Sequence, residues 1–307
     1  MPPRSLLAAM ATLLLLALTP AVVQADLRSQ NVLPSPILNR PMPYSVYLPP
    51  GYQDEGRDYP VLYLLHGGGT GQPSDWFTLA GIDQMLDRLI LSGRIRPLIA
   101  VAPDGRRDAE NQVATYFLDD ADGAQRWQQM FMDDFIPGIE SRYPTLTGAE
   151  GRAILGISMG GMAATIYQLR HPDRFAGIAA LSASFRTDDQ LLALSGQGYE
   201  TRFGAVLGTS LQGSDRLTPQ WDALRPDTLI GATDPARFSR VPRLYFDIGS
   251  DDPFFEAAAN LHLALRDAGL NHRFRVSEGE HDWRFWRGAL HEALLHIDAV
   301  LTRDYGE

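Results

Sequence analysis

The first stretch of the sequence that could carry out chemistry is Gly156-Ile157-Ser158-Met159-Gly160-Gly161, which lies between an apolar run and a helical pattern. A serine on a sharp turn from a strand to a helix projects its hydroxyl above the sheet, and the flanking glycines permit the crowded backbone. The N-terminus of the helix that follows favours developing negative charge. The string alone is weak evidence, but its setting between strand and helix favours a nucleophile over an idle glycine-rich turn. Ser158 is the predicted nucleophile.

A second glycine-rich stretch, His66 to Gly69, directly follows the apolar run 61–65. Such a loop can turn backbone N–H groups toward a tetrahedral oxyanion, because no Cβ blocks the approach. In a nucleophile-elbow arrangement the other donor is the N–H of the residue after the serine, here Met159. A phosphate-binding loop would need GxGxxG or GxxxxGK, and neither occurs here. We expect His66 to stabilise this loop rather than to act as a catalyst.

Two late loops carry the acid and base that a serine nucleophile needs. One contains Asp251 and Asp252 and follows a predicted strand at 243–248; the other contains His281 and follows a predicted strand at 273–276. The chain order is therefore serine, aspartate, histidine, as expected when the three groups sit on successive strands of one sheet. Of the seven histidines, only His281 lies in a late loop just beyond the end of a strand, so we predict it to be the general base.

Strand and helix patterns alternate along the rest of the chain, which predicts a mostly parallel sheet with helices on both faces. Continuous apolar runs of about five residues indicate strands buried on both faces. The segment 186–240 lacks clear periodicity and is too long for an ordinary connection, so we expect an insertion or lid beside the site. The predicted strands are 44–48, 61–65, 98–102, 153–157, 177–181, 243–248 and 273–276, and the predicted helices are 82–90, 130–143 (kinked at Pro137), 159–169, 255–268 and 283–301.

The first 25 residues have the pattern of a secretory signal peptide. Arg4 precedes an apolar run at 6–18, and small residues before Asp26 suit a signal peptidase, so cleavage is expected between Ala25 and Asp26. The alternative, a membrane anchor, is disfavoured because about 13 apolar residues cannot span roughly 30 Å of hydrocarbon as a helix. We therefore expect an exported protein, periplasmic or secreted, whose single domain comprises residues 26–307 and has no membrane span after signal removal.

The composition excludes several classes of protein. The chain has no cysteine, which removes disulfides, thiolate metal sites and a cysteine nucleophile. Its net charge of −10 leaves no basic excess for nucleic acid, and all 27 basic residues are arginines, which excludes a Schiff-base lysine. The stretch Asp120 to Gly123 hints at calcium, but the register of a calcium loop fails there, and a solvated loop is favoured. The sequence predicts no cofactor and no metal.

The chain resembles the esterase D-like branch of the α/β-hydrolases, the putative esterases. Its members include feruloyl and acetylxylan esterases, S-formylglutathione hydrolases, enterochelin esterases and mycolyltransferases. The resemblance runs from about residue 40 to the end and is weakest across 186–240. The stretches that carry it are YSVYLPPGY (44–52), YPVLYLLHG (59–67), GISMGG (156–161), HPDRF (171–175), GSDDPF (249–254) and GEHDWRFWR (279–287).

The resemblance implies an α/β-hydrolase fold in which Ser158 is the nucleophile, His281 the base, and Gly68 and Met159 the oxyanion donors. It also implies that the acid is the second aspartate of the GSDD loop, Asp252. Pro253 supports this choice, since it restricts Asp252 to extended conformations and so helps hold one imidazole tautomer. Asp251 remains the alternative.

These residues and the resemblance predict an exported serine esterase that acts on short-chain or aryl esters, free or linked to polysaccharide, through an acyl-enzyme. An acyltransferase of the mycolyltransferase type would use the same residues, and a catalytically silent binding protein is a third possibility. Trp76, near the oxyanion loop, and Trp283, beside His281, are candidates for substrate stacking, with core packing as the alternative; Trp127 and Trp286 are expected in the core. The sequence names neither the ester nor the oligomeric state.

Overall fold

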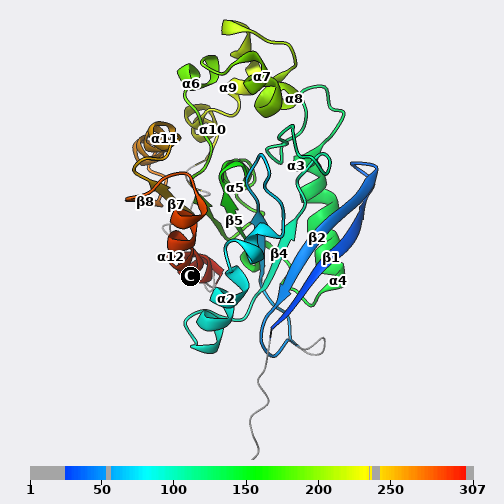
Figure 1. The fold of residues 1–307 in the computed structure, drawn as a ribbon. Helices are drawn as coiled ribbons and strands as arrows, with labels where there is room; N and C mark the ends of the chain where they lie inside the picture. The colour runs from blue at the N-terminus through cyan, green and yellow to red at the C-terminus, as the bar shows by residue number, and fades with distance from the viewer. Residues whose placement is uncertain (1–24, 53–56, 235, 237–242, 302–307) are drawn as a thin grey trace, which may run out of the picture.

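A computed structural model describes residues 25–52, 57–234, 236 and 243–301 of the chain. Within these residues one mixed sheet of eight strands runs in the order β1-β2-β4-β3-β5-β6-β7-β8 (Figure 1). β1 and β2 pair antiparallel with each other, β2 pairs antiparallel with β4, and all the remaining pairs are parallel. The strands are β1 (Asp26–Ser35), β2 (Arg40–Leu48), β3 (Val61–Leu65), β4 (Ile99–Pro103), β5 (Arg152–Ile157), β6 (Gly177–Leu181), β7 (Leu244–Gly249) and β8 (His272–Ser277).

The central strands are the apolar runs that the sequence predicts as buried on both faces. Every residue of β3, β4, β6 and β7 is buried, as two covered faces require. The mostly parallel sheet with flanking helices confirms the predicted α/β-hydrolase fold class. β1 was not predicted, because eight of its ten residues are exposed or half-buried at the sheet edge and show no regular alternation.

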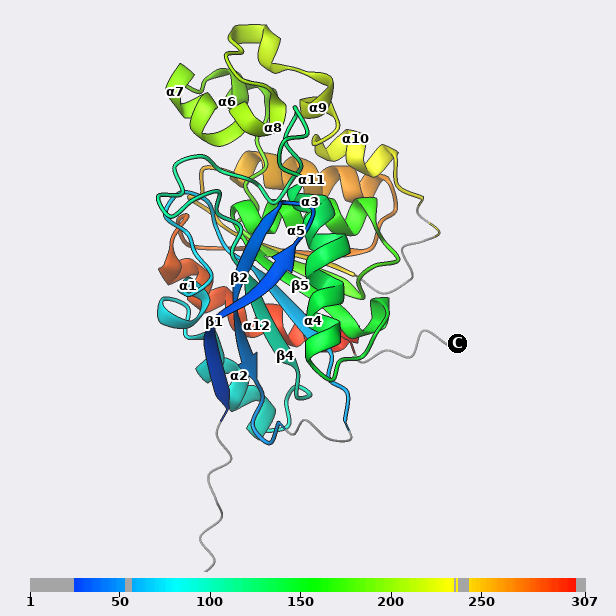
Figure 2. The same ribbon diagram turned by 90° about the vertical axis from the view of Figure 1, so that its right-hand side faces the viewer.

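Helices cover the two faces of the sheet and bury two apolar clusters (Figure 2). On one face lie α1 (Asp75–Thr78), α2 (Ile82–Leu91) and α12 (Trp283–Leu301). On the other face lie α3 (Trp127–Met130), α4 (Ile136–Arg142), α5 (Met159–Arg170) and α11 (Phe255–Asp267). α5 is buried along almost its whole length, which fixes the direction in which its N-terminus points.

The helix predicted at 130–143 is interrupted. α3 passes into a π-helical turn at Phe131–Phe135, and α4 begins directly after it. Pro137 lies in the first turn of α4 and has no N–H to donate to the carbonyl four residues earlier, so the regular hydrogen-bond pattern cannot run through it. The predicted kink at Pro137 thus takes the form of a wider turn just before the proline.

The segment after β6 folds into short helices at the top of the molecule in Figures 1 and 2, above the carboxyl ends of the parallel strands. Several of them begin at side chains that accept a backbone N–H, as Thr187, Ser195 and Thr218 do. Single turns of three to six residues have no helical periodicity to detect, which is why the sequence showed none. The helices are α6 (Asp188–Leu192), α7 (Gly196–Tyr199), α8 (Ala205–Leu207), α9 (Pro219–Asp222) and α10 (Pro226–Gly231), with a π-helical turn at Glu200–Gly204 and a 3₁₀ turn at Gly213–Arg216.

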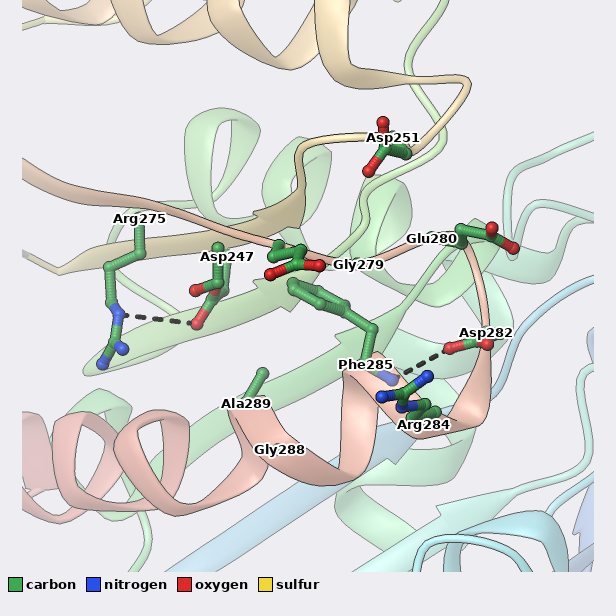
Figure 3. Close-up of a pocket in the computed structure, with 12 residues that line it drawn as sticks. Asp247, Asp251, Arg275, Gly279, Glu280, Asp282, Arg284, Phe285, Gly288 and Ala289 are labelled. Atoms are coloured by element: carbon green, nitrogen blue, oxygen red, sulfur yellow. Dashed lines mark hydrogen bonds and ion pairs between the residues drawn. The ribbon is translucent and has the colours of Figure 1, made fainter.

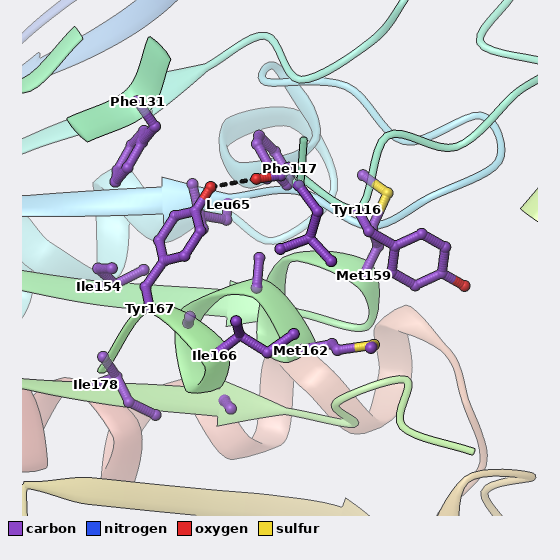
Figure 4. Packing of buried hydrophobic residues seen from close by; sticks show 14 of the residues in the cluster. Leu65, Tyr116, Phe117, Phe131, Ile154, Met159, Met162, Ile166, Tyr167 and Ile178 are labelled. Carbon is purple, nitrogen blue, oxygen red and sulfur yellow. Dashed lines mark hydrogen bonds between the residues drawn. The ribbon is translucent and has the colours of Figure 1, made fainter. Parts of the chain in front are cut away.

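The core around the β5–α5 turn combines aliphatic and aromatic side chains (Figure 4). The ring of Tyr167, on α5, stacks on Phe131, and its hydroxyl donates a hydrogen bond to the carbonyl of Phe117. Burial raises the pKa of Tyr167 well above its usual range, so the phenol stays a neutral donor. This bond connects the loop after β4 to the helix that follows Ser158.

Candidate active site

Ser158 lies on a strained turn between β5 and α5. Its backbone has φ 55° and ψ −115°, a conformation that a non-glycine residue rarely adopts. The two neighbouring glycines are sterically required, since a Cβ on Gly156 would lie 2.1 Å from the carbonyl oxygen of Gly160, and one on Gly160 would lie 2.1 Å from that of Leu65. The turn is held in place by a hydrogen bond from the Ser158 N–H to the carbonyl of Leu181 on β6, 2.9 Å long.

The structure brings Ser158, His281 and Asp252 into one hydrogen-bonded chain. The Nε2 atom of His281 lies 2.9 Å from the Oγ atom of Ser158, and its Nδ1 atom lies 2.8 Å from Oδ2 of Asp252. Asp252 is the aspartate that the sequence analysis selected. Asp251 instead accepts a hydrogen bond from the hydroxyl of Ser250 and is exposed.

The pKa of Asp252 lies below its usual value, although two effects oppose each other. Burial raises this pKa, but the hydrogen bond and charge of His281, the N–H of Phe254 and the hydroxyl of Ser182 lower it by more. The second carboxylate oxygen, Oδ1, accepts the Phe254 N–H at 2.9 Å. Asp252 is thus a buried carboxylate that stays charged and has a fixed orientation.

The loop that carries His281 is anchored at the start of α12 (Figure 3). Oδ1 of Asp282 accepts the backbone N–H of Phe285 at 2.9 Å, which satisfies one of the free donors at the helix N-terminus. Trp286 donates its indole N–H to the hydroxyl of Ser182 at 2.9 Å, and its ring meets the His281 ring edge-on. The imidazole therefore packs against the indole of Trp286, which is itself held in place by its hydrogen bond to Ser182.

The glycine loop after β3 lies beside Ser158. A Cβ on Gly68 would be 3.5 Å from Sδ of Met159, and one on Gly67 would be 3.7 Å from Cβ of Ser158. Gly68 and Met159 both line the cavity that contains the serine. The two predicted oxyanion donors therefore lie next to each other in the cavity that contains the nucleophile.

His66 stabilises this loop, as expected. Its Nε2 atom accepts the backbone N–H of Gly105 at 3.0 Å, so the ring proton is on Nδ1, which donates to the carbonyl of Gly67 at 2.7 Å. His66 is only 2% exposed, and burial lowers its pKa, so the ring is neutral. It joins the loops after β3 and β4.

A cavity of about 360 Å³ opens onto Ser158 and His281. Besides the glycine loop it is lined by Tyr116 from the loop after β4, Arg186 from the segment after β6 and Phe254 from the loop after β7. Sequence reasoning did not select Arg186 or Phe254 for the site, because a single arginine or phenylalanine in an irregular segment carries no signal of such a role.

The two tryptophans proposed to contact substrate do not line this cavity. Trp76 is wholly buried in the apolar cluster beneath α1 and α2, so the prediction that it stacks on substrate is wrong. It is close to the oxyanion loop in sequence, but α1 turns its side chain toward the sheet. Trp283 is half-buried and packs edge-on against Trp286. Trp127 and Trp286 are buried, as predicted.

No cluster of three or more acidic or histidine side chains among the described residues has the geometry to hold a metal ion. In the stretch that hinted at calcium, the carboxylate of Asp120 binds the guanidinium of Arg107 through both oxygens. Within the same ranges no helix combines the length and the apolar character needed to cross a bilayer.

Comparison with known proteins identifies the family. The family model described as "Putative esterase" matches residues 35–297, which is most of the chain. The chain belongs to this family. The esterase Rv1288 of Mycobacterium tuberculosis is 30% identical to this putative esterase over 255 residues, which cover 78% of this chain and 52% of that protein. This chain thus spans about half the length of the mycobacterial relatives that it matches.

Two further relatives resemble this putative esterase over most of their own length. An acetyl esterase of Caldicellulosiruptor saccharolyticus is 28% identical over 249 residues, covering 78% of this chain and 84% of that protein. Among solved structures, a ferulic acid esterase has a TM-score of 0.76 and 27% identity, covering 91% of this chain and 99% of that one.

Proposed function

We propose that this protein is an exported serine carboxylic ester hydrolase in which Ser158, His281 and Asp252 form the catalytic triad. The observation that carries the proposal is the chain of two hydrogen bonds, 2.9 Å from Ser158 to His281 and 2.8 Å from His281 to Asp252. Nucleophile, base and orienting acid in this order are what acyl transfer through serine requires. The family to which the chain belongs supports the same reaction class.

The geometry gives each residue a step in the reaction. Nε2 of His281 takes the proton of the Ser158 hydroxyl as Oγ bonds to the ester carbonyl carbon, while Asp252 stabilises the imidazolium through Nδ1. The N–H groups of Gly68 and Met159 bind the oxyanion. His281 then gives its proton to the leaving alcohol, and an acyl-enzyme remains on Oγ. Water, deprotonated by the same imidazole, releases the acid and restores the serine.

Short-chain or aryl esters fit the cavity best. Its volume of about 360 Å³ is at the small end of the range for ligand pockets, and the rings of Tyr116 and Phe254 line it. The named activities of two relatives, acetyl esterase and ferulic acid esterase, lie in the same chemical class.

Export rests on the signal-peptide pattern of residues 1–25, of which 1–24 lie outside the described residues. β1 begins at Asp26, the residue expected to follow cleavage, so removal of the leader would leave the sheet intact. N-terminal sequencing of the protein recovered from the periplasm or the medium tests this part. The expected first residue is Asp26, and exported protein that retains the apolar run 6–18 would contradict it.

The experiment that tests the reaction measures release of product from 4-nitrophenyl esters of increasing chain length, from methyl ferulate and from acetylated xylan. Each is assayed with the wild type and with Ser158→Ala, and with and without an added alcohol as acceptor. We expect hydrolysis of acetyl or feruloyl esters that depends on Ser158. Activity confined to the long-chain 4-nitrophenyl esters would contradict the substrate class, and transfer to the alcohol in preference to water would identify an acyltransferase instead.

A further inference from the structure

Two arginines line the cavity above Ser158, although the chain as a whole is acidic. Arg186 and Arg202 both line it, and no aspartate or glutamate of the described residues does. The net charge of the chain is −10, so the charge of the residues that line this cavity is opposite in sign to the net charge of the chain. An aliphatic acyl group would gain little from guanidinium groups in its binding site, whereas a carboxylate would gain charge-assisted hydrogen bonds.

Arg186 is held in a fixed position by ring and hydrogen-bond contacts, but it forms no ion pair with a described residue. Its guanidinium carbon lies 4.6 Å from the ring centroid of Phe254 and 5.1 Å from that of Phe203. Nη1 donates to the hydroxyl of Tyr116 at 3.0 Å and to the carbonyl of Ser184 at 3.2 Å. Among the described residues no carboxylate lies within ion-pair distance of this side chain. Asp188, the nearest acidic residue in sequence, binds Arg225 and the indole of Trp221.

The donors of Arg186 that remain suit a carboxylate. Its two Nη1 hydrogens are occupied, which leaves Nε–H and the two Nη2 hydrogens without partners in the described part of the chain. Nε–H and one Nη2–H form the edge of a guanidinium that binds both oxygens of a carboxylate. Arg186 also borders a neighbouring cavity, but that one is lined by four acidic residues and would repel an anion.

Ser184 supplies an independent observation. It lines the cavity at Ser158, is 3% exposed, and its hydroxyl has no hydrogen-bond partner in the described structure. A buried hydroxyl without a partner costs free energy unless a ligand satisfies it. Its backbone N–H donates to the carbonyl of Ser158 at 3.2 Å, so the residue that carries this unsatisfied hydroxyl is a direct neighbour of the nucleophile.

We propose that Arg186, assisted by Ser184, forms an anion subsite, and that the preferred substrate is an ester that also carries a carboxylate. This inference rests on the proposed ester hydrolysis and specifies its substrate class. The carboxylate accepts hydrogen bonds from the free edge of Arg186 and from the Ser184 hydroxyl, which anchors the ester for attack by Ser158. Arg202, exposed at the rim, adds attraction but no fixed contact.

The test compares matched charged and neutral esters with the full chain at about 0.15 M salt. Mono-4-nitrophenyl adipate and 4-nitrophenyl hexanoate place the charge on the acyl side; 4-acetoxybenzoate and 4-methylphenyl acetate place it on the alcohol side. For each pair the readout is the ratio of kcat/KM for the anionic ester to that for the neutral one, after subtraction of the rate with Ser158→Ala. In the wild type we expect this ratio to exceed about 10 for at least one pair, since a hydrogen bond to a charged group contributes at least about tenfold.

Variants separate the subsite from a structural role. Arg186→Met should lower the ratio about 10- to 100-fold, mainly through KM of the anionic ester, and Arg186→Lys should restore part of it. Arg94→Gln removes the same charge from an exposed position away from the cavity and should leave the ratio unchanged. A role in packing alone would lower kcat/KM for both esters of a pair and leave their ratio as it was.

The possible outcomes distinguish failure of the anion subsite from failure of the proposed ester hydrolysis. A wild type that hydrolyses neutral esters through Ser158 but shows no preference for the anionic member of either pair overturns the subsite and leaves the esterase standing, whether or not Arg186→Met folds. A ratio that survives in Arg186→Lys and Arg186→Met also overturns it. Absence of hydrolysis of every ester, charged or neutral, refutes the proposed function itself.

Discussion

Replacing Asp252 by asparagine tests the proposed triad because the structure dictates which way the amide must face. Oδ1 of Asp252 accepts the backbone N–H of Phe254, and Oδ2 accepts Nδ1–H of His281. In Asp252→Asn the amide oxygen must stay with the Phe254 N–H, so the NH₂ group faces His281. The ring then accepts at Nδ1 and carries its proton on Nε2, where it can no longer take the proton of Ser158.

The expected loss in kcat is about 10⁴-fold, the size of effect that the wrong imidazole tautomer has in other serine triads. The assay is hydrolysis of 4-nitrophenyl acetate, with thermal unfolding as a control for folding. The matched control is Asp251→Asn, which makes the same change of charge at an exposed neighbour whose side chain bonds only to Ser250 in the described structure. It should leave kcat close to that of the parent.

Two results would refute this reasoning. One is a folded Asp252→Asn protein that keeps more than about a tenth of the parental kcat, since a misplaced proton cannot support that rate. The other is a larger loss in Asp251→Asn than in Asp252→Asn, which would move the acid to the neighbouring aspartate while leaving Ser158 and His281 in their roles.

Three further predictions concern the scaffold. Trp76→Ala should lower the free energy of unfolding by about 3–5 kcal/mol in chemical denaturation and leave KM unchanged, whereas a raised KM at intact stability would return Trp76 to the substrate site. Gly160→Ala should lower both Tm and kcat, because the new Cβ would overlap the Leu65 carbonyl; a Tm equal to the parent's would contradict the packing of the turn. Burial lowers the pKa of His66 in the folded state, so the ring takes up a proton on unfolding and stability falls as the pH drops below about 6.5. Between pH 7 and pH 5 the Tm of His66→Gln should therefore fall by less than the Tm of the parent. An equal fall in Tm would count against a buried neutral ring.

The parts of the fold that were predictable are those whose residues carry a local signal. β3 and β6 match their predicted bounds because five consecutive apolar residues between turn residues leave few alternatives. The β5–α5 turn was predictable because its close backbone contacts require glycine at Gly156 and Gly160, two residues before and after Ser158. β1 was not, since an edge strand that is mostly exposed needs no apolar pattern.

The site was predictable only where the chemistry needs particular residue types. Ser158, Asp252 and His281 follow the ends of β5, β7 and β8, so their convergence could be inferred from strand order alone. Arg186 and Phe254 have no such signal, because their places in the cavity depend on how irregular segments cross the top of the sheet. Trp76 was mispredicted because closeness in sequence to the glycine loop does not set the direction in which a side chain points.

The central claim, that Ser158 forms a covalent acyl-enzyme, is tested most directly by trapping it. The protein is treated with diethyl 4-nitrophenyl phosphate, and the intact mass and peptide map are measured together with the remaining esterase activity. The account predicts one diethylphosphoryl group per chain, located on Ser158, with loss of activity in proportion to labelling and no label in Ser158→Ala. Labelling of a different residue, or a Ser158→Ala protein whose hydrolysis stays within about tenfold of the parent, would contradict it.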